Sequence, residues 1–132
     1  MKKAAIGISL FIIASVAILA YLASIIFSEN VYYQKGSLEY CLLTQEIIKE
    51  LPLETQAEAK FFYSSADGNK PAKNTVEFSG TISDSILSDY FSSNQYELIE
   101  NGSYKKDSQE VIVEYIGPDK NRIKITVLDY LR

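Results

Sequence analysis

The side chains that most often carry out acid–base or metal chemistry are scarce in this chain, which contains no histidine. Histidine is the side chain that titrates near neutral pH without tuning. Its absence excludes nucleophile systems that depend on a histidine base, and it excludes the HExxH zinc site. Zinc would have to be held by carboxylates and the single thiol, Cys41, which is an unusual ligand set. The sequence therefore predicts a non-enzymatic protein without a cofactor or metal.

Carboxylates are the remaining candidates for acid–base chemistry or calcium binding. A glycosidase needs a pair of carboxylates as acid and base, and the candidate pairs here are Asp84 with Asp89 and Glu46 with Glu50. Carboxylates at helical spacing usually lie on a solvated face, so we do not favour catalysis by these pairs. The segment 67–69, Asp-Gly-Asn, lacks the alternating acidic residues and the closing glutamate of an EF-hand loop. We interpret it as a turn.

The single cysteine cannot form an internal disulfide. In an oxidising compartment Cys41 is buried and inert, paired with another chain, or a free thiol. Its place on an expected helix favours the buried alternative, because free cysteine behaves as a small hydrophobe.

The net charge limits the partners of this protein. The whole chain carries −4, and removing Lys2 and Lys3 from the 13 basic residues leaves 11 against 17 acidic residues, about −6 for the remainder. Nucleic-acid binding needs a basic stripe, and the nearest candidate, Lys105-Lys106, is followed at once by Asp107. The composition predicts that nucleic acid is not a partner.

Residues 4–27 form an apolar run without a charged side chain. A helix needs roughly 20 apolar residues to cross the hydrocarbon core of a bilayer. A core helix of a globular domain seldom stays apolar on every face for this length. The run therefore predicts a transmembrane helix, and the membrane is the first predicted partner.

The charges that flank the run predict its orientation. Lys2 and Lys3 precede it and Glu29 is the first charge after it, so the positive-inside rule places the N-terminus in the cytoplasm. The rest of the chain then lies outside the cytoplasm of an inner or plasma membrane. Tyr32 and Tyr33 suit either the outer headgroup layer or packing within the domain.

A cleaved signal peptide is the alternative for this segment. Its apolar region is usually about 7–15 residues long and ends at a small-x-small site. Here the run is longer, the site 15–17 lies inside it, and a cut after Ala23 would put the bulky Tyr21 three places before the cut, where the motif needs a small residue. We therefore favour an uncleaved anchor.

The remaining residues predict an α+β domain around an antiparallel sheet, in the order α-β-β-α-β-β-β after the anchor. Apolar spacing and a proline stop predict a first helix, and Ser83 with Asp84 predicts the start of a second one. Alternation between turns predicts the strands. The expected parts are a cytoplasmic end at 1–3, the span at 4–27, a juxtamembrane link at 28–36, and a domain at 37–132, containing helices at 37–51 and from 83, and strands at 56–64, 75–81, 96–100, 109–116 and 122–130.

The final predicted hairpin is apolar on both faces. One face carries Val111, Val113 and Tyr115 together with Ile123, Ile125 and Val127. The opposite face carries a second apolar set, the Ile112 set: Ile112, Ile116, Leu128 and Tyr130. The expected helix 37–51 is the first candidate to cover this set, and a protein partner or a second copy of the chain is the other.

Two classes of function remain after these exclusions. The favoured hypothesis is an anchored envelope protein whose outer domain binds another protein, or forms a homo-oligomer, through the Ile112 set. The alternative is a domain that binds a small ligand, or acts on it, in a pocket between sheet and helices, with Tyr63, Tyr90 and Tyr115 as its wall. For these tyrosines, ordinary core packing is the simpler interpretation.

Overall fold

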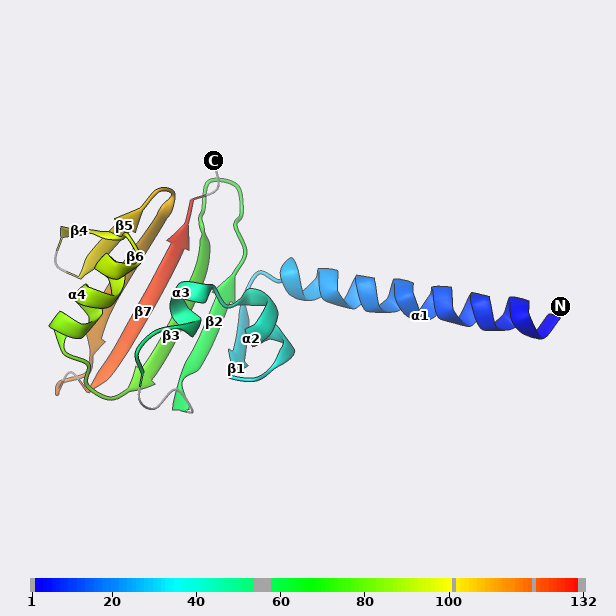
Figure 1. Ribbon diagram of the computed structural model, residues 1–132, viewed down its shortest axis with the longest axis horizontal. Helices are drawn as coiled ribbons and strands as arrows, with labels where there is room; N and C mark the ends of the chain where they lie inside the picture. Colours follow the sequence, from blue (N-terminus) through cyan, green and yellow to red (C-terminus); the bar gives the residue numbers. More distant parts are fainter. Residues whose placement is uncertain (1, 54–57, 101, 120, 131–132) are drawn as a thin grey trace.

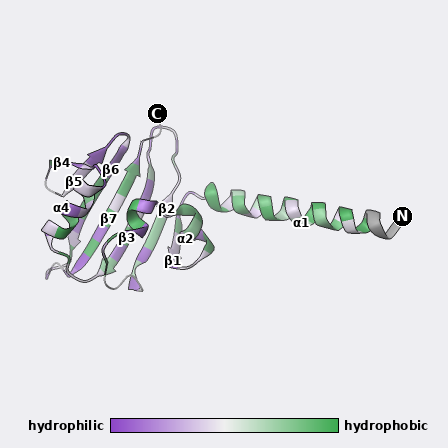
Figure 2. Ribbon diagram, viewed as in Figure 1, coloured by the Kyte–Doolittle hydropathy of each residue, from purple (hydrophilic) through white to green (hydrophobic). Residues whose placement is uncertain are grey.

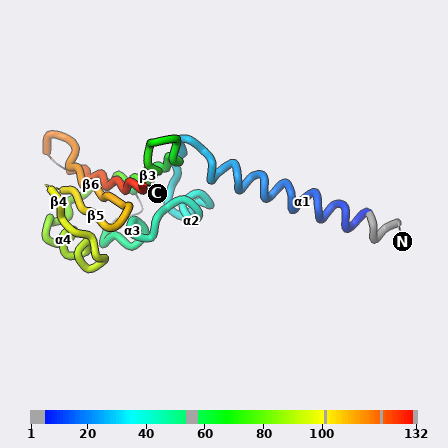
Figure 3. Tube along the Cα trace, turned by 90° about the horizontal axis from the view of Figure 1, so that it is seen from above, coloured from blue at the N-terminus to red at the C-terminus, as the bar shows by residue number. Residues whose placement is uncertain are grey.

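A computed structural model describes residues 2–53, 58–100, 102–119 and 121–130, with the backbone alone for residues 2–5. A long helix, α1 (Lys2–Ile26), leads into a domain in which short helices pack on one face of an antiparallel sheet (Figures 1 and 3). The α+β class expected from the sequence is confirmed.

Within the described ranges the sheet has seven strands in the spatial order β1-β2-β3-β7-β6-β5-β4, and every neighbouring pair is antiparallel. The long strands β3 and β7 lie near the centre, while β1 and β4 form the edges. The strands are β1 (Val31–Gln34), β2 (Lys60–Ser64), β3 (Ala72–Ser79), β4 (Glu97–Glu100), β5 (Ser103–Lys106), β6 (Gln109–Ile116) and β7 (Arg122–Asp129).

Two of these strands are additions to the expected order. Strand β1 lies inside the segment 28–36 that was expected to be a link, and it pairs with β2 along its whole length. Strand β5 occupies the region of the Lys105-Lys106 pair and completes a hairpin with β4. Each has only four residues, too few for alternation to be distinctive. The first residues of the expected strand 56–64 lie outside the described ranges, and β2 begins at Lys60.

The single helix expected over residues 37–51 is wrong, because the structure has two short helices, α2 (Leu38–Leu43) and α3 (Glu46–Lys49). The chain is extended at Thr44, with φ −76° and ψ 126°. The Thr44 hydroxyl donates to the Tyr33 hydroxyl at 3.1 Å, and the Asn74 side chain donates to the carbonyl of Leu43. These contacts with the sheet stabilise the break.

The next helix, α4 (Asp84–Ser93), begins as the sequence predicts, because Ser83 accepts a hydrogen bond from the backbone N–H of Ile86. Leu87 and Phe91 are buried against the sheet. The hydroxyl of Tyr90 donates to the carbonyl of Ile47 at 2.8 Å and so connects α4 to the α3 helix.

Helices α2, α3 and α4 share one face of the sheet (Figure 3). The core lies between this face and the helices, and the largest buried side chains are Phe61, Phe91, Ile48, Leu87, Ile123 and Ile125. Helix α1 is uniformly apolar along most of its length and projects away from the sheet domain (Figure 2). Among its residues, Ile25 is buried in the domain core.

Candidate functional site

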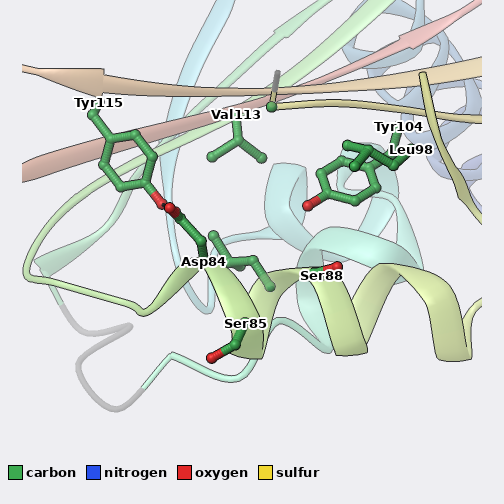
Figure 4. A pocket seen from close by; sticks show the side chains of 9 residues that line it. Asp84, Ser85, Ser88, Leu98, Tyr104, Val113 and Tyr115 are labelled. Atoms are coloured by element: carbon green, nitrogen blue, oxygen red, sulfur yellow. Dashed lines mark hydrogen bonds between the residues drawn. The ribbon is translucent and has the colours of Figure 1, made fainter. Parts of the chain in front are cut away.

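A groove of about 590 Å³ lies between α4 and the end of the sheet formed by β4, β5 and β6 (Figure 4). This is the end of the sheet farthest from α1 (Figure 1). The residues that line the groove come from α4 and from all three strands: Asp84, Ser85, Leu87, Ser88, Leu98, Gly102, Tyr104, Val113 and Tyr115.

The floor of the groove is apolar and its outer wall is an edge strand. Leu87 and Tyr104 are buried there, while Leu98 on β4 is 62% exposed although it faces the same side of the sheet as Tyr104. All four residues of β4 are exposed, and the β4–β5 register is irregular between Leu98 and Glu100. A bulge of this kind increases the local twist of an edge strand. The groove therefore has an open apolar side at β4.

The hairpin turn beside the groove depends on a glycine. Gly102 has a φ of +77°, and an added Cβ would lie 2.8 Å from the carbonyl oxygen of Val113. The backbone N–H of Val113 donates to the carbonyl of Gly102 at 2.7 Å. Only glycine therefore permits this close approach of the two strands.

One end of the groove is polar. The hydroxyl of Tyr115 on β6 donates a hydrogen bond to the carboxylate of Asp84 in the first turn of α4, and the two side chains point toward each other (Figure 4). Burial, the hydrogen bond to Asp84 and the charge of that carboxylate together raise the pKa of Tyr115 to about 12.

The polar end of the groove can bind a polar or cationic group. A phenol with a pKa near 12 stays protonated at neutral pH and acts as a donor, so Tyr115 is neither a base nor a nucleophile there. A carboxylate accepts several hydrogen bonds. Asp84 can therefore receive a cationic group from a ligand while it accepts the hydrogen bond from Tyr115.

Of the three tyrosines proposed to line a pocket, the structure places Tyr115 in this groove. Tyr90 is partly buried and uses its hydroxyl to reach the carbonyl of Ile47. Tyr63 is partly buried against the core, and burial raises its pKa. These two side chains take structural positions.

Of the four acidic candidates, Asp84 lines the groove. Glu46 forms an ion pair with Lys49 at 2.8 Å on α3, and Asp89 is exposed on α4. In the part of the chain that the structure describes, no group of three or more His, Cys, Asp or Glu residues is placed to hold a metal ion. The backbones of Asp67 and Lys70 hydrogen-bond to each other, which makes segment 67–69 a turn, as expected.

The expectation that Cys41 is buried is wrong, because its side chain is exposed on α2. The helical spacing placed it at the side of the apolar stripe formed by Tyr40 and Leu43. Those two residues face the core as expected, and Cys41 beside them does not.

The second apolar set of the final hairpin lies on the sheet face opposite the helices, where three of its members are half-buried and the last is exposed: Ile112, Ile116, Leu128 and Tyr130. The expectation that the first helix covers this face is wrong, since α2 and α3 lie on the other one (Figure 3). Among the described residues no helix lies over it.

Charged side chains from neighbouring strands divide this open face. Lys124 pairs with Glu114 at 2.8 Å, and Arg122 pairs with Glu77. The first pair lies between Ile116 and Leu128. Ile116 lies opposite Arg122, which is six residues before Leu128 on β7, or about 20 Å along the strand. The open face is therefore a mixed surface with small apolar areas.

Sequence reasoning missed three exposed apolar side chains, of which Leu98 lines the groove. Leu98 and Ile99 were assigned to a strand, and Ile86 to the apolar face of a helix. All three are exposed in the structure. The signal was the adjacent pair Leu98-Ile99, because a strand with one buried face does not bury two successive side chains.

Comparison of the chain with protein-family models, curated proteins and solved structures found no match. Within the described residues, one helical segment, Ile6–Ile26, is long and apolar enough to cross a membrane. A signal sequence near the N-terminus can meet the same criterion, and the α1 helix is weakly consistent with either role.

Proposed function

We propose that this chain is a single-pass protein of an inner or plasma membrane whose outer domain binds another protein without catalysing a reaction. The charge-free segment Ile6–Ile26 supports the anchor, and Lys2 and Lys3 support a cytoplasmic N-terminus. Ile25 supports retention of the helix, because its side chain belongs to the domain core and cleavage after Ala23 would leave it near a free end.

The groove is the surface that we propose for the partner. The observation that carries this choice is the 62% exposure of Leu98 beside the buried Leu87 and Tyr104 of the groove floor, at the end of the sheet farthest from the anchor (Figure 1). An apolar groove that is open to solvent is a common feature of interaction surfaces.

The chemistry of the groove defines the partner segment. Its floor accepts an apolar side chain beside Leu98 and Tyr104, and its polar end accepts a lysine or arginine at Asp84. The negative charge of the domain favours approach by a basic protein surface. We therefore propose a partner segment that carries an apolar residue and a basic residue close together.

Site-specific photo-cross-linking in intact membranes tests this proposal. A photoreactive amino acid at position 98 should give one discrete adduct with another protein, and Asp84→Ala should reduce its yield. The matched control carries the same probe at Ile112, on the open face of the sheet. Adducts from position 112 and none from position 98 would reject the groove and favour the Ile112 set. Absence of adducts at both positions would contradict protein binding by either surface.

A small ligand is the second candidate, because a groove of about 590 Å³ lies in the usual size range of ligand sites and combines an apolar wall with a few polar groups. A thermal-shift screen of the full chain in detergent tests it. A compound that stabilises the unchanged chain and the Glu97→Gln variant, but not the Asp84→Asn variant, would support a ligand site. No stabilisation across a broad library would favour the protein partner.

A further inference from the structure

We infer that the exposed face of α2, together with Phe27, lies in the outer interfacial layer of the membrane and holds the domain down on the bilayer with its groove facing away. This inference rests on the proposed anchor and assigns a lipid-contacting surface to the domain itself.

The first support is the depth of α2. The 21 residues of Ile6–Ile26 rise about 1.5 Å each, a length of about 31 Å, which matches a hydrocarbon core of about 30 Å. The last turn of α1 therefore reaches the boundary of the hydrocarbon. Helix α2 contacts α1, and Ile25 in that last turn is buried in the domain core. A helix beside this turn lies at the same depth (Figure 1).

The second support is the composition of α2, whose sequence LEYCLL is apolar on two faces. Tyr40 and Leu43 face the core, where the Tyr40 ring meets Phe61 edge-on. On the other face Leu38 is 46% exposed, Leu42 is 44% exposed, and Cys41 is exposed beside them. Glu39 is the one charged residue of this helix, and an exposed apolar face of this kind suits a position at the membrane interface.

The third support is the chain that connects the anchor to the sheet. Phe27, the first residue beyond α1, is 78% exposed, and strand β1 begins at Val31. So short a connection keeps β1 and α2 next to the bilayer. Tyr32 is exposed, as a headgroup-layer position requires, whereas Tyr33 is buried against Phe61 and belongs to the core.

The contact is driven by apolar insertion, because the domain carries about −6 and anionic headgroups would repel it. Short interfacial helices of this kind insert their apolar face about 5–10 Å into the headgroup and acyl boundary. The contact should therefore form on neutral phosphatidylcholine and should not change between low and high salt.

Cys41, the single cysteine of the chain, is a native reporter for this contact. The full chain is labelled at Cys41 with a nitroxide in detergent and reconstituted into phosphatidylcholine vesicles. Collision rates are then measured with oxygen, which concentrates in lipid, and with a water-soluble nickel complex. The matched control carries Cys41→Ser with Glu97→Cys, which moves the label to the distal edge strand. The oxygen-to-nickel ratio should be several-fold higher at position 41 than at position 97. Leu42→Glu should lower the ratio at position 41 and leave that at position 97 unchanged.

Equal, water-like ratios at the two positions would overturn the inference. Oxidative formation of a Cys41-linked dimer in vesicles that hold the unlabelled chain would also overturn it, because a second copy of the chain would then cover α2. An alkaline wash separates these results from a failure of the anchor. A chain that stays in the washed membranes while its Cys41 label is aqueous refutes the α2 contact alone. A chain released by the wash refutes the proposed anchor.

Discussion

Phe91 holds α4 against the sheet, and we expect its replacement by alanine to destabilise the domain strongly. Its ring is fully buried, with its centroid 4.6 Å from that of Tyr104 and 6.1 Å from that of Tyr96. Truncating a buried phenylalanine to alanine costs about 3–5 kcal/mol. A small domain has a free energy of unfolding of about 5–15 kcal/mol. Phe91→Ala should therefore remove a large fraction of it.

The matched control for this change is Ile86→Ala on the same helix. The Ile86 side chain is 50% exposed, so its truncation loses only part of the roughly 1.5–3 kcal/mol that full burial of such a side chain contributes. We expect a cost of about 1 kcal/mol or less. Urea unfolding of the full chain in a non-ionic detergent, followed by near-ultraviolet circular dichroism of its tyrosines, measures both variants. Equal costs for Phe91→Ala and Ile86→Ala would refute the described packing of α4.

Three further changes test local features of the same domain. Ser83→Ala removes the N-cap of α4 and should lower the free energy of unfolding by about 1 kcal/mol in the same urea assay. Gly102→Ala places a Cβ 2.8 Å from the carbonyl oxygen of Val113 at a left-handed φ, and should cost more than about 2 kcal/mol. The pKa of Tyr115 rises from 10.0 to about 12 on folding, so the stability contributed by its protonated form is complete below pH 10 and is lost as the pH rises to about 12. Tyr115→Phe, which also removes the hydrogen bond to Asp84, should reduce the fall in melting temperature across that window, and an unchanged fall would contradict the assigned contact.

The elements with strong local signals could be predicted from the sequence. Alternation in Val111 to Tyr115 and in Ile123 to Val127 predicts the hairpin of β6 and β7 at the centre of the sheet. Ser83 followed by an apolar stripe predicts α4. The fold class follows from these elements, because antiparallel strands with one apolar face require helices to cover it.

The remaining features depend on contacts between distant residues. Helix α2 ends where Thr44 meets Tyr33 and Asn74 contacts Leu43, and no local signal encodes those partners. The open side of the groove depends on β4 being an edge strand, since the same Leu98 would be covered if another strand or helix lay beside it. The strand order that makes β4 an edge is a property of the assembled sheet. The groove could therefore not be predicted from the sequence, although Tyr115 was among the tyrosines proposed to line a pocket.

The central claim is that α1 stays on the mature chain and spans a membrane. Intact-mass analysis of the protein recovered from alkaline-washed membranes tests it most directly. We predict that the protein stays in the membrane pellet with a mass that includes the whole of Ile6–Ile26. Recovery in the supernatant, or a mature chain that begins after Ala23, would contradict the anchor and the membrane contact inferred for α2.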